Sequence, residues 1–265
     1  MDVYHFTPGR TPLLVSMPHV GTHVPDDIAG RMTNSALTLP DTDWHVDRLY
    51  DFLGELGAGV IRATHSRYVI DLNRPPDGQA LYPGASNTEL CPTTQFDDSP
   101  IYRPGQRPDG AEIAARLDRY WRPYHERLAR ELAAIMARHG FALLFDAHSI
   151  RSVVPRFFAG RLPDINLGTG GGTSAASELA ALLIETAGDA VDYSSVLNGR
   201  FKGGYITRQY GRPADGVHAV QLELAQVTYM DEDPPFTFRD DLAGRVRPVL
   251  RRIVAAMLEW ADTRT

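Results

Sequence analysis

Short apolar runs alternate along the chain with stretches in which apolar residues recur at helical spacing. The apolar runs predict β-strands at 11–18, 58–65, 67–73, 141–149, 193–198 and 218–225. The helical spacing predicts helices at 41–57, 109–140, 174–188 and 239–261. Pro123 lies inside the second of these helices and should kink it or split it in two, because proline cannot donate the helical hydrogen bond.

This alternation of strands and helices is typical of an α/β protein. We expect a three-layer α/β/α sandwich with a mainly parallel or mixed central sheet, of the phosphorylase/hydrolase-like kind. We find no repeat, low-complexity tract or convincing linker, so residues 1–265 are predicted to form a single domain. Ligands of such sheets bind beyond the carboxyl ends of the strands. The polar clusters of the sequence are predicted there: MPHVG, DLNRPPDG, FDAHSIRS and QLELAQ.

The composition excludes some classes of partner. The net charge is −6 with intermixed signs, so the broad basic face needed to bind nucleic acid is not expected. No apolar run approaches the roughly 20 residues that span a bilayer, and the N-terminus lacks a signal-peptide pattern. The single cysteine, Cys91, has no intrachain partner and no adjacent base. We expect a cytoplasmic protein without nucleic-acid or membrane partners.

Histidines follow two of the predicted strands. His19 comes directly after the first strand, and His148 ends the run that also carries Asp146 on the same face. A lone histidine at a strand end is more often a structural, hydrogen-bonded residue, but two such histidines favour a metal site. Neutral imidazoles suit zinc, which in catalytic sites keeps three protein ligands and one open position, although another divalent ion would also fit. His23, four residues after His19, is interpreted as a solvated loop residue.

The third ligand is open at this point. Asp43 and His45 are the nearest candidates, at the start of the helix predicted after the first loop. A carboxylate in the first turn of a helix is also favoured by the helix dipole, so Asp43 has an ordinary structural explanation. The residues alone therefore leave both candidates in place.

Other polar residues in the clusters could act beside a metal. Glu223 lies in an apolar strand and could be the general base for a metal-bound water, or simply half of an ion pair. Asn73 and Arg74 follow another predicted strand. The guanidinium of Arg74 could bind a substrate carboxylate or form a salt bridge with Asp71 or Asp77.

Seven segments together resemble the N-formylglutamate amidohydrolase family, over nearly the whole chain. They are MPHVG, LPDTDWHVDRLYDF, SRYVIDLNRP, LFDAHSIRSVVPR, LPDINLGT, LNGRFKGGYITRQYG and HAVQLELAQ. A more distant likeness is to zinc carboxypeptidases and aspartoacylase-type deacylases. Those relatives take a carboxylate ligand three residues after the first histidine, where this chain has Thr22, so the carboxylate must come from elsewhere.

The resemblance implies that the protein hydrolyses N-formyl-L-glutamate to formate and L-glutamate, in histidine degradation. It implies zinc, or another divalent metal, on His19 and His148; for the third ligand, which the resemblance does not supply, we choose Asp43, with His45 as the rival. Glu223 would be the base, and Asn73 and Arg74 would bind the dicarboxylate substrate. A second carboxylate needs a further cation, for which Arg151, Arg208 and Lys202 are candidates, and Gly203 and Gly204 would allow close backbone approach or a mobile lid. The alternatives are a deacylase or carboxypeptidase-like hydrolase for another N-acyl acidic amino acid, or a non-catalytic protein that binds an acidic metabolite.

Overall fold

The computed structural model describes residues 1–79 and 86–263. Its centre is one seven-stranded sheet with the strand order β1-β3-β2-β4-β7-β5-β6. Strands β2, β3, β4 and β7 run parallel, whereas β1 is antiparallel to β3 and β5 is antiparallel to β7. The sheet is therefore mixed. The strand bounds are β1 Tyr4–Thr7, β2 Leu13–Met17, β3 Gly59–Ala63, β4 Ala142–Ile150, β5 Ile165–Gly168, β6 Ser195–Leu197 and β7 Val217–Ala225.

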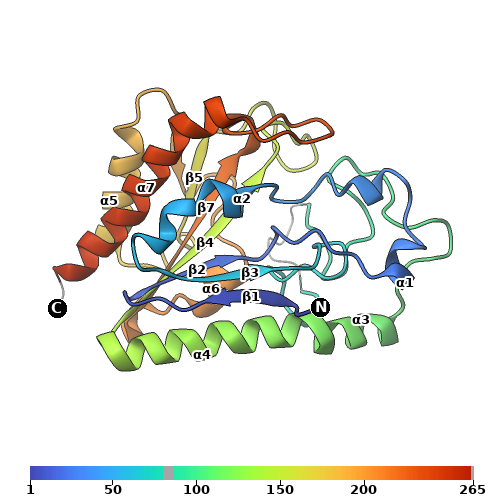
Figure 1. Cartoon of the computed structure of the whole chain (residues 1–265), viewed down its shortest axis with the longest axis horizontal. Helices are drawn as coiled ribbons and strands as arrows, with labels where there is room; N and C mark the ends of the chain where they lie inside the picture. The colour runs from blue at the N-terminus through green and yellow to red at the C-terminus, as the bar shows by residue number, and fades with distance from the viewer. Residues whose placement is uncertain (80–85, 264–265) are drawn as a thin grey trace.

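Helices cover both faces of the sheet, which confirms the three-layer prediction (Figure 1). The long helix α4 runs along one face, while α5 and α7 lie on the other. Alternate residues of a strand point to opposite faces of the sheet. Leu13 and Val15 pack in the hydrophobic cluster that contains α7, and Leu14 packs in the cluster that contains α4. The helix bounds are α1 Asp26–Ala29, α2 Val46–Leu49, α3 Gly110–Arg116, α4 Arg122–His139, α5 Ser177–Gly188, α6 Tyr205–Tyr210 and α7 Asp240–Asp262.

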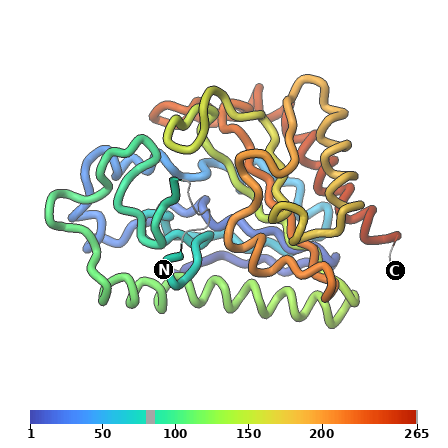
Figure 2. Tube along the Cα trace, turned by 180° about the vertical axis from the view of Figure 1, so that it is seen from behind, coloured from blue at the N-terminus to red at the C-terminus, as the bar shows by residue number. Residues whose placement is uncertain are grey.

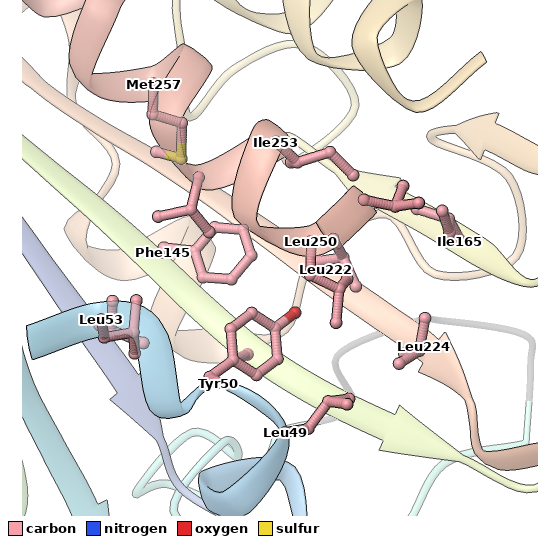
Figure 3. Packing of buried hydrophobic residues seen from close by; sticks show 14 of the residues in the cluster. Leu49, Tyr50, Leu53, Phe145, Ile165, Leu222, Leu224, Leu250, Ile253 and Met257 are labelled. Carbon is pink, nitrogen blue, oxygen red and sulfur yellow. The ribbon is translucent and has the colours of Figure 1, made fainter. Parts of the chain in front are cut away.

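The core between the sheet and α7 fixes the position of the central strands. Phe145 of β4 and Leu222 of β7 meet Leu250 and Ile253 of α7, with Tyr50 packed beside them (Figure 3). All five side chains are buried. Burial of each apolar side chain of this size is worth about 1.5–3 kcal/mol relative to exposure, so β4 and β7 are held firmly.

The predicted helix at 109–140 is divided, as the proline indicated. Asp109 caps α3 by accepting a hydrogen bond from the backbone N–H of Glu112 at 2.9 Å. A five-residue π-helical stretch, Leu117–Trp121, then separates α3 from α4. Pro123 lies in the first turn of α4, where its missing N–H would otherwise have bonded to a carbonyl of that stretch. The α-helix is thus interrupted near Pro123 by a π-helical stretch, while the backbone stays helical throughout.

Two other predicted elements are wrong. Residues 67–73 form turns rather than a strand: Tyr68 and Ile70 are buried, but the backbone pairs locally, with Val69 N–H donating to Ser66 at 2.9 Å. An apolar run thus reports burial and not strand pairing. The helix predicted at 41–57 shrinks to α2 and the 3₁₀ turn Asp51–Gly54, since His45 has a left-handed φ of 62° and the preceding residues form a loop. Strands β1 and β5 and helix α6 were not predicted.

Along the face that α4 covers, β4 and β7 change from apolar to polar toward their carboxyl ends. Leu144 of β4 is followed on this face by Asp146 and His148, and Ala219 of β7 is followed by Gln221 and Glu223. The connections that follow β2 and β3 gather at one end of the molecule, away from the carboxyl terminus (Figure 2). Polar side chains therefore collect at the strand ends predicted to bind a ligand.

None of the helices in the described ranges is long and apolar enough to cross a membrane. The single-domain interpretation of residues 1–265, the cytoplasmic location and the lack of nucleic-acid partners stay predictions.

Candidate metal centre

Three buried side chains converge at the carboxyl ends of β2 and β4. His19 follows β2, His148 lies near the end of β4, and Asp43 comes from the loop before α2. One ligand atom of each lies within 4.8 Å of the others. Asp43 Oδ2 is 3.0 Å from His148 Nδ1 and 3.7 Å from His19 Nδ1. The structure thus brings together the three residues that the sequence favoured as ligands.

Buried carboxylates hold the outer nitrogens of both histidines. His19 Nε2 lies 2.7 Å from Asp71 Oδ1, and His148 Nε2 lies 3.0 Å from Asp146 Oδ2. A carboxylate can only accept, so Nε2 of each histidine donates to the carboxylate behind it, and each Nδ1 points to the common centre, where it would coordinate a bound ion. Two imidazole nitrogens and one carboxylate oxygen form a donor set that zinc prefers. The residues therefore fit a bound divalent metal.

The loops that deliver these ligands are held by backbone contacts. The Asp43 N–H donates to the carbonyl of His19 at 3.1 Å, which ties the loop before α2 to the end of β2. A Cβ at Gly21 would overlap the backbone of Thr64 and His65, so glycine is needed where the turn after His19 packs on the chain that follows β3.

The electrostatics of the centre reflect its dense charge. Burial raises the pKa of Asp43, but hydrogen bonds and charge from His148 and His19 outweigh it and hold that pKa well below its usual range. Asp71 behaves similarly: burial raises its pKa, but Arg67 and His19 outweigh burial and hold the pKa well below its usual range. Arg67 Nη2 lies 2.6 Å from Asp71 Oδ2 and Nη1 lies 3.9 Å from Asp43 Oδ1. Both carboxylates are therefore kept ionised.

The other two histidines considered from the sequence lie away from this group. His45 Nε2 donates to the carbonyl of Phe236 at 2.7 Å, and its ring packs against Trp44 and Phe238. The rival third ligand is thus occupied elsewhere, and Asp43 takes the place that both residues were considered for. His23 pairs with His65 at 4.9 Å between ring centroids, outside the group.

A pocket opens onto the centre. It encloses about 570 Å³ of space outside atoms, including solvent at its mouth, and it is lined by His19, His148 and Glu223 together with Arg74 and Arg200. Glu223 is buried, and its β7 position pairs in register with His148 of β4. Burial raises the pKa of Glu223 to about 8, with Asp43 adding to the effect and His148 opposing it.

Asn73 contacts the centre, but its amide has structural partners. Its Oδ1 accepts from the N–H of Ile206 at 2.8 Å, and its Nδ2 lies 3.0 Å from His148 Nε2 and 3.4 Å from Asp146 Oδ2. Arg74 is held by Thr88, to whose carbonyl its Nε donates at 3.1 Å. Both residues line the pocket, as the sequence led us to expect.

Two predicted substrate arginines do not line this pocket. Arg151 Nη2 lies 2.7 Å from Asp233 Oδ1 and borders a different hollow, beside Pro40 and Val153. Arg208 is exposed, and its Nε donates to the carbonyl of Gly203 at 2.9 Å. Lys202 is exposed as well. A role of these side chains in substrate binding stays a prediction.

Sequence reasoning missed three residues of the site. Arg200 lines the pocket from the loop before α6, Gln221 lies beside Glu223 on β7, and Asp71 backs His19. The alternation of Gln221 with Glu223 on one strand face was the available signal for the glutamine. Asp71 was considered only as a salt-bridge partner of Arg74, and no pattern in the sequence pointed to Arg200.

Comparison with known proteins shows the family of this chain. Residues 11–230 match the family model described as N-formylglutamate amidohydrolase. The chain belongs to this family. Family relatives named N-formylglutamate deformylase come from Pseudomonas aeruginosa, at 53% identity over 263 residues, and Pseudomonas putida, at 52% over 262 residues. Each alignment covers 99% of this chain and 98% of the relative.

A solved member of the N-formylglutamate amidohydrolase family has the same overall structure. The crystal structure of N-formylglutamate amidohydrolase from Ralstonia eutropha JMP134 superposes with a TM-score of 0.80 at 26% identity. The superposition covers 99% of this chain and 98% of that one. The fold described above is therefore that of the family.

Proposed function

We propose that this protein hydrolyses N-formyl-L-glutamate to formate and L-glutamate with a divalent metal, zinc in the first place, held by His19, Asp43 and His148. The observation that carries the proposal is the pair of histidines and the aspartate, each histidine backed by a carboxylate, at the base of a pocket that also holds Glu223. The deformylase names of relatives that are 52–53% identical support the choice of substrate.

The metal and Glu223 divide the chemistry. A bound zinc ion would supply Lewis acidity, which brings the pKa of water toward 7 and polarises a carbonyl oxygen. Glu223 accepts the proton of the water that adds to the formyl carbon, and it delivers that proton to the amine nitrogen as the C–N bond breaks. Glu223 is suited to this exchange because it is buried in the pocket, on the strand next to His148, and the positive charge of a bound ion would offset the burial that raises its pKa.

The arginines of the pocket recognise the dicarboxylate substrate. Arg67 is committed to Asp71 and Asp43, so it stabilises the centre instead. Arg74 and Arg200 line the pocket wall, and the Arg200 guanidinium lies 5.4 Å from the ring centroid of Phe201 and 5.8 Å from that of Phe157. A guanidinium presents a planar fork that matches a carboxylate, and the two arginines give each substrate carboxylate a partner.

Formate release tests the proposal directly. The wild-type protein should release formate from N-formyl-L-glutamate, lose this activity on prolonged chelation, and regain it when zinc is added back. Activity that persists after the metal content has fallen to zero overturns the metal chemistry. A folded, zinc-loaded protein that releases no formate overturns the substrate and directs attention to other N-acyl acidic amino acids. Roles in histidine degradation and in the cytoplasm stay predictions.

The carboxylate contact has its own test. Arg200→Gln should lower kcat/KM for N-formyl-L-glutamate about 10- to 100-fold, a loss of about 1.4–2.7 kcal/mol typical of a charge-assisted hydrogen bond. N-formyl-L-glutamine lacks the side-chain charge, so its turnover should change much less if Arg200 meets that carboxylate. Equal losses on both substrates would remove Arg200 from side-chain recognition. The exposed Arg208→Gln variant serves as the matched control.

A further inference from the structure

A buried amide, Gln221, lies between the Glu223 carboxylate and the loop before α6. Its side chain is 3% exposed, on the same face of β7 as Glu223. Gln221 Oε1 accepts from the N–H of Gly204 at 2.7 Å, and Gln221 Nε2 donates to Glu223 Oε2 at 3.2 Å. No other side chain among the described residues donates a hydrogen bond to the Glu223 carboxylate.

The Gly204 N–H fixes which way the amide of Gln221 points. A backbone N–H can only donate, so the end of the amide that meets Gly204 is the oxygen. The NH₂ end then faces Glu223. The flipped amide would set two donors against each other at Gly204 and two acceptors against each other at Glu223. The donor to Glu223 is therefore present in one orientation only.

The loop that carries Gly204 is itself fixed on its other side. A Cβ at Gly204 would overlap the side-chain amide of Asn73, so only glycine brings this backbone close enough. Asn73 Oδ1 accepts from the N–H of Ile206 at 2.8 Å, while its Nδ2 donates to Asp146 Oδ2 at 3.4 Å. Two buried amides thus tie the start of α6 to the proposed base on one side and, on the other, to the carboxylate that backs a proposed metal ligand.

We propose that Gln221 is the positioning residue for Glu223, holding its carboxylate in the orientation that receives the proton of the attacking water. This inference rests on the proposed function, because it assumes that Glu223 is the base. A buried carboxylate without a donor is free to turn among its rotamers, and a displacement of about 1 Å from the reacting atoms can cost about 100-fold in rate. Gln221 touches no substrate atom in this account and acts through Glu223.

Two substitutions separate positioning from structural support. Gln221→Glu keeps an acceptor for Gly204 and replaces the donor to Glu223 with a second carboxylate of nearly the same size. Gln221→Met removes both hydrogen bonds and keeps the volume. Each should lower kcat about 10- to 100-fold, with KM within about threefold of the wild type. The matched control is Gln95→Met, because Gln95 is 1% exposed and its amide bonds to Ser35, Ser99 and Pro100.

A double-mutant cycle then decides the mechanism. In a Glu223→Gln background the same Gln221 substitutions should change kcat by less than about twofold, since the residue through which they act has already been disabled. Equal fold-losses in the two backgrounds, in variants with unchanged melting temperatures, would overturn the inference. The Gln95→Met control should reduce the melting temperature without reducing kcat.

A crystal structure of the Gln221→Met variant provides a test that does not depend on enzymatic activity. We expect the Glu223 carboxylate to leave its wild-type position, and a carboxylate that stays in place overturns the inference. A wild-type protein that fails to release formate overturns the proposed substrate alone, and the crystal structure still decides whether Gln221 positions Glu223.

Discussion

His148 and His125 are both almost fully buried, and they contact the consecutive residues Asn73 and Leu72. Their surroundings nevertheless differ in charge. Both ring nitrogens of His148 face carboxylates, Asp43 at 3.0 Å and Asp146 at 3.0 Å. His125 Nε2 donates to the carbonyl of Leu72 at 2.8 Å, and Asn73, the next residue, contacts His148.

The partners of His125 are otherwise neutral. Its Nδ1 lies 3.0 Å from the hydroxyl of Tyr210, and its ring stacks on Trp121 at 3.7 Å between centroids. Burial lowers the pKa of His125 to about 4, whereas Asp146 and Asp43 overcome burial and raise the pKa of His148 well above its usual value. One region stabilises positive charge and the other excludes it. Buried carboxylates, more than buried histidines, therefore distinguish the candidate metal centre.

The largest expected effect is the loss of the metal from the charged region. His148→Ala should abolish tight zinc binding, measured as metal content after dialysis, and lower formate release about 10³-fold, because the main electrostatic stabilisation of the reaction is lost with the ion. His125→Gln, in the neutral region, should retain the wild-type metal content. Stoichiometric, tightly held zinc in the His148→Ala variant would refute the assignment of this ligand.

The neutral region around His125 should make the stability of the protein depend on pH. Unfolded His125 has the usual pKa of 6.5, and the folded pKa is about 4, so between these values the unfolded chain binds the proton more strongly. The contribution of His125 to the free energy of unfolding should be greatest above pH 6.5 and should fall as the pH drops toward 4, by at most about 3 kcal/mol. Denaturant unfolding of the wild type and of His125→Gln from pH 4 to pH 7 measures the difference.

The His125→Gln curve should be flatter than the wild-type curve over that range, whatever its absolute stability. His65, whose pKa burial also lowers to about 4, titrates in both proteins and cancels in the comparison. Parallel curves would show that His125 does not keep its neutral form in the folded state.

Much of the fold could be predicted from periodicity, but irregular burial could not. The apolar runs at β2, β4 and β7 are fully buried, and strands were predicted there correctly. The run around Tyr68 and Ile70 has the same composition and forms turns, because loops rather than neighbouring strands cover it. Strand β5 is only four residues long, too short for a period to appear.

The candidate site divides in the same way. His19 follows β2 and His148 lies near the end of β4, so their convergence at one edge of the sheet could be predicted from the parallel order of these strands. Asp43 could be named but not separated from His45, since the choice depends on the path of a loop. Arg200 and Arg151 show most clearly what could not be predicted. Arg200 lines the pocket, whereas Arg151 pairs with Asp233, and only the loop conformations determine this difference.

The smallest expected effect concerns the carboxylates that distinguish the two regions. Asp146→Asn should weaken zinc binding about 10- to 100-fold, measured by competition with a chelator, because His148 loses the anion that orients its ring and raises its basicity. Asp146 is the cleaner choice than Asp71, whose carboxylate also pairs with Arg67, so that its removal would leave a buried cation unpaired. The matched control is Asp164→Asn, a carboxylate at the border of burial that bonds to Ser194 and Arg161 instead of a histidine. A loss of affinity no greater than that of the control would mean that burial and the histidines alone suffice to build the site.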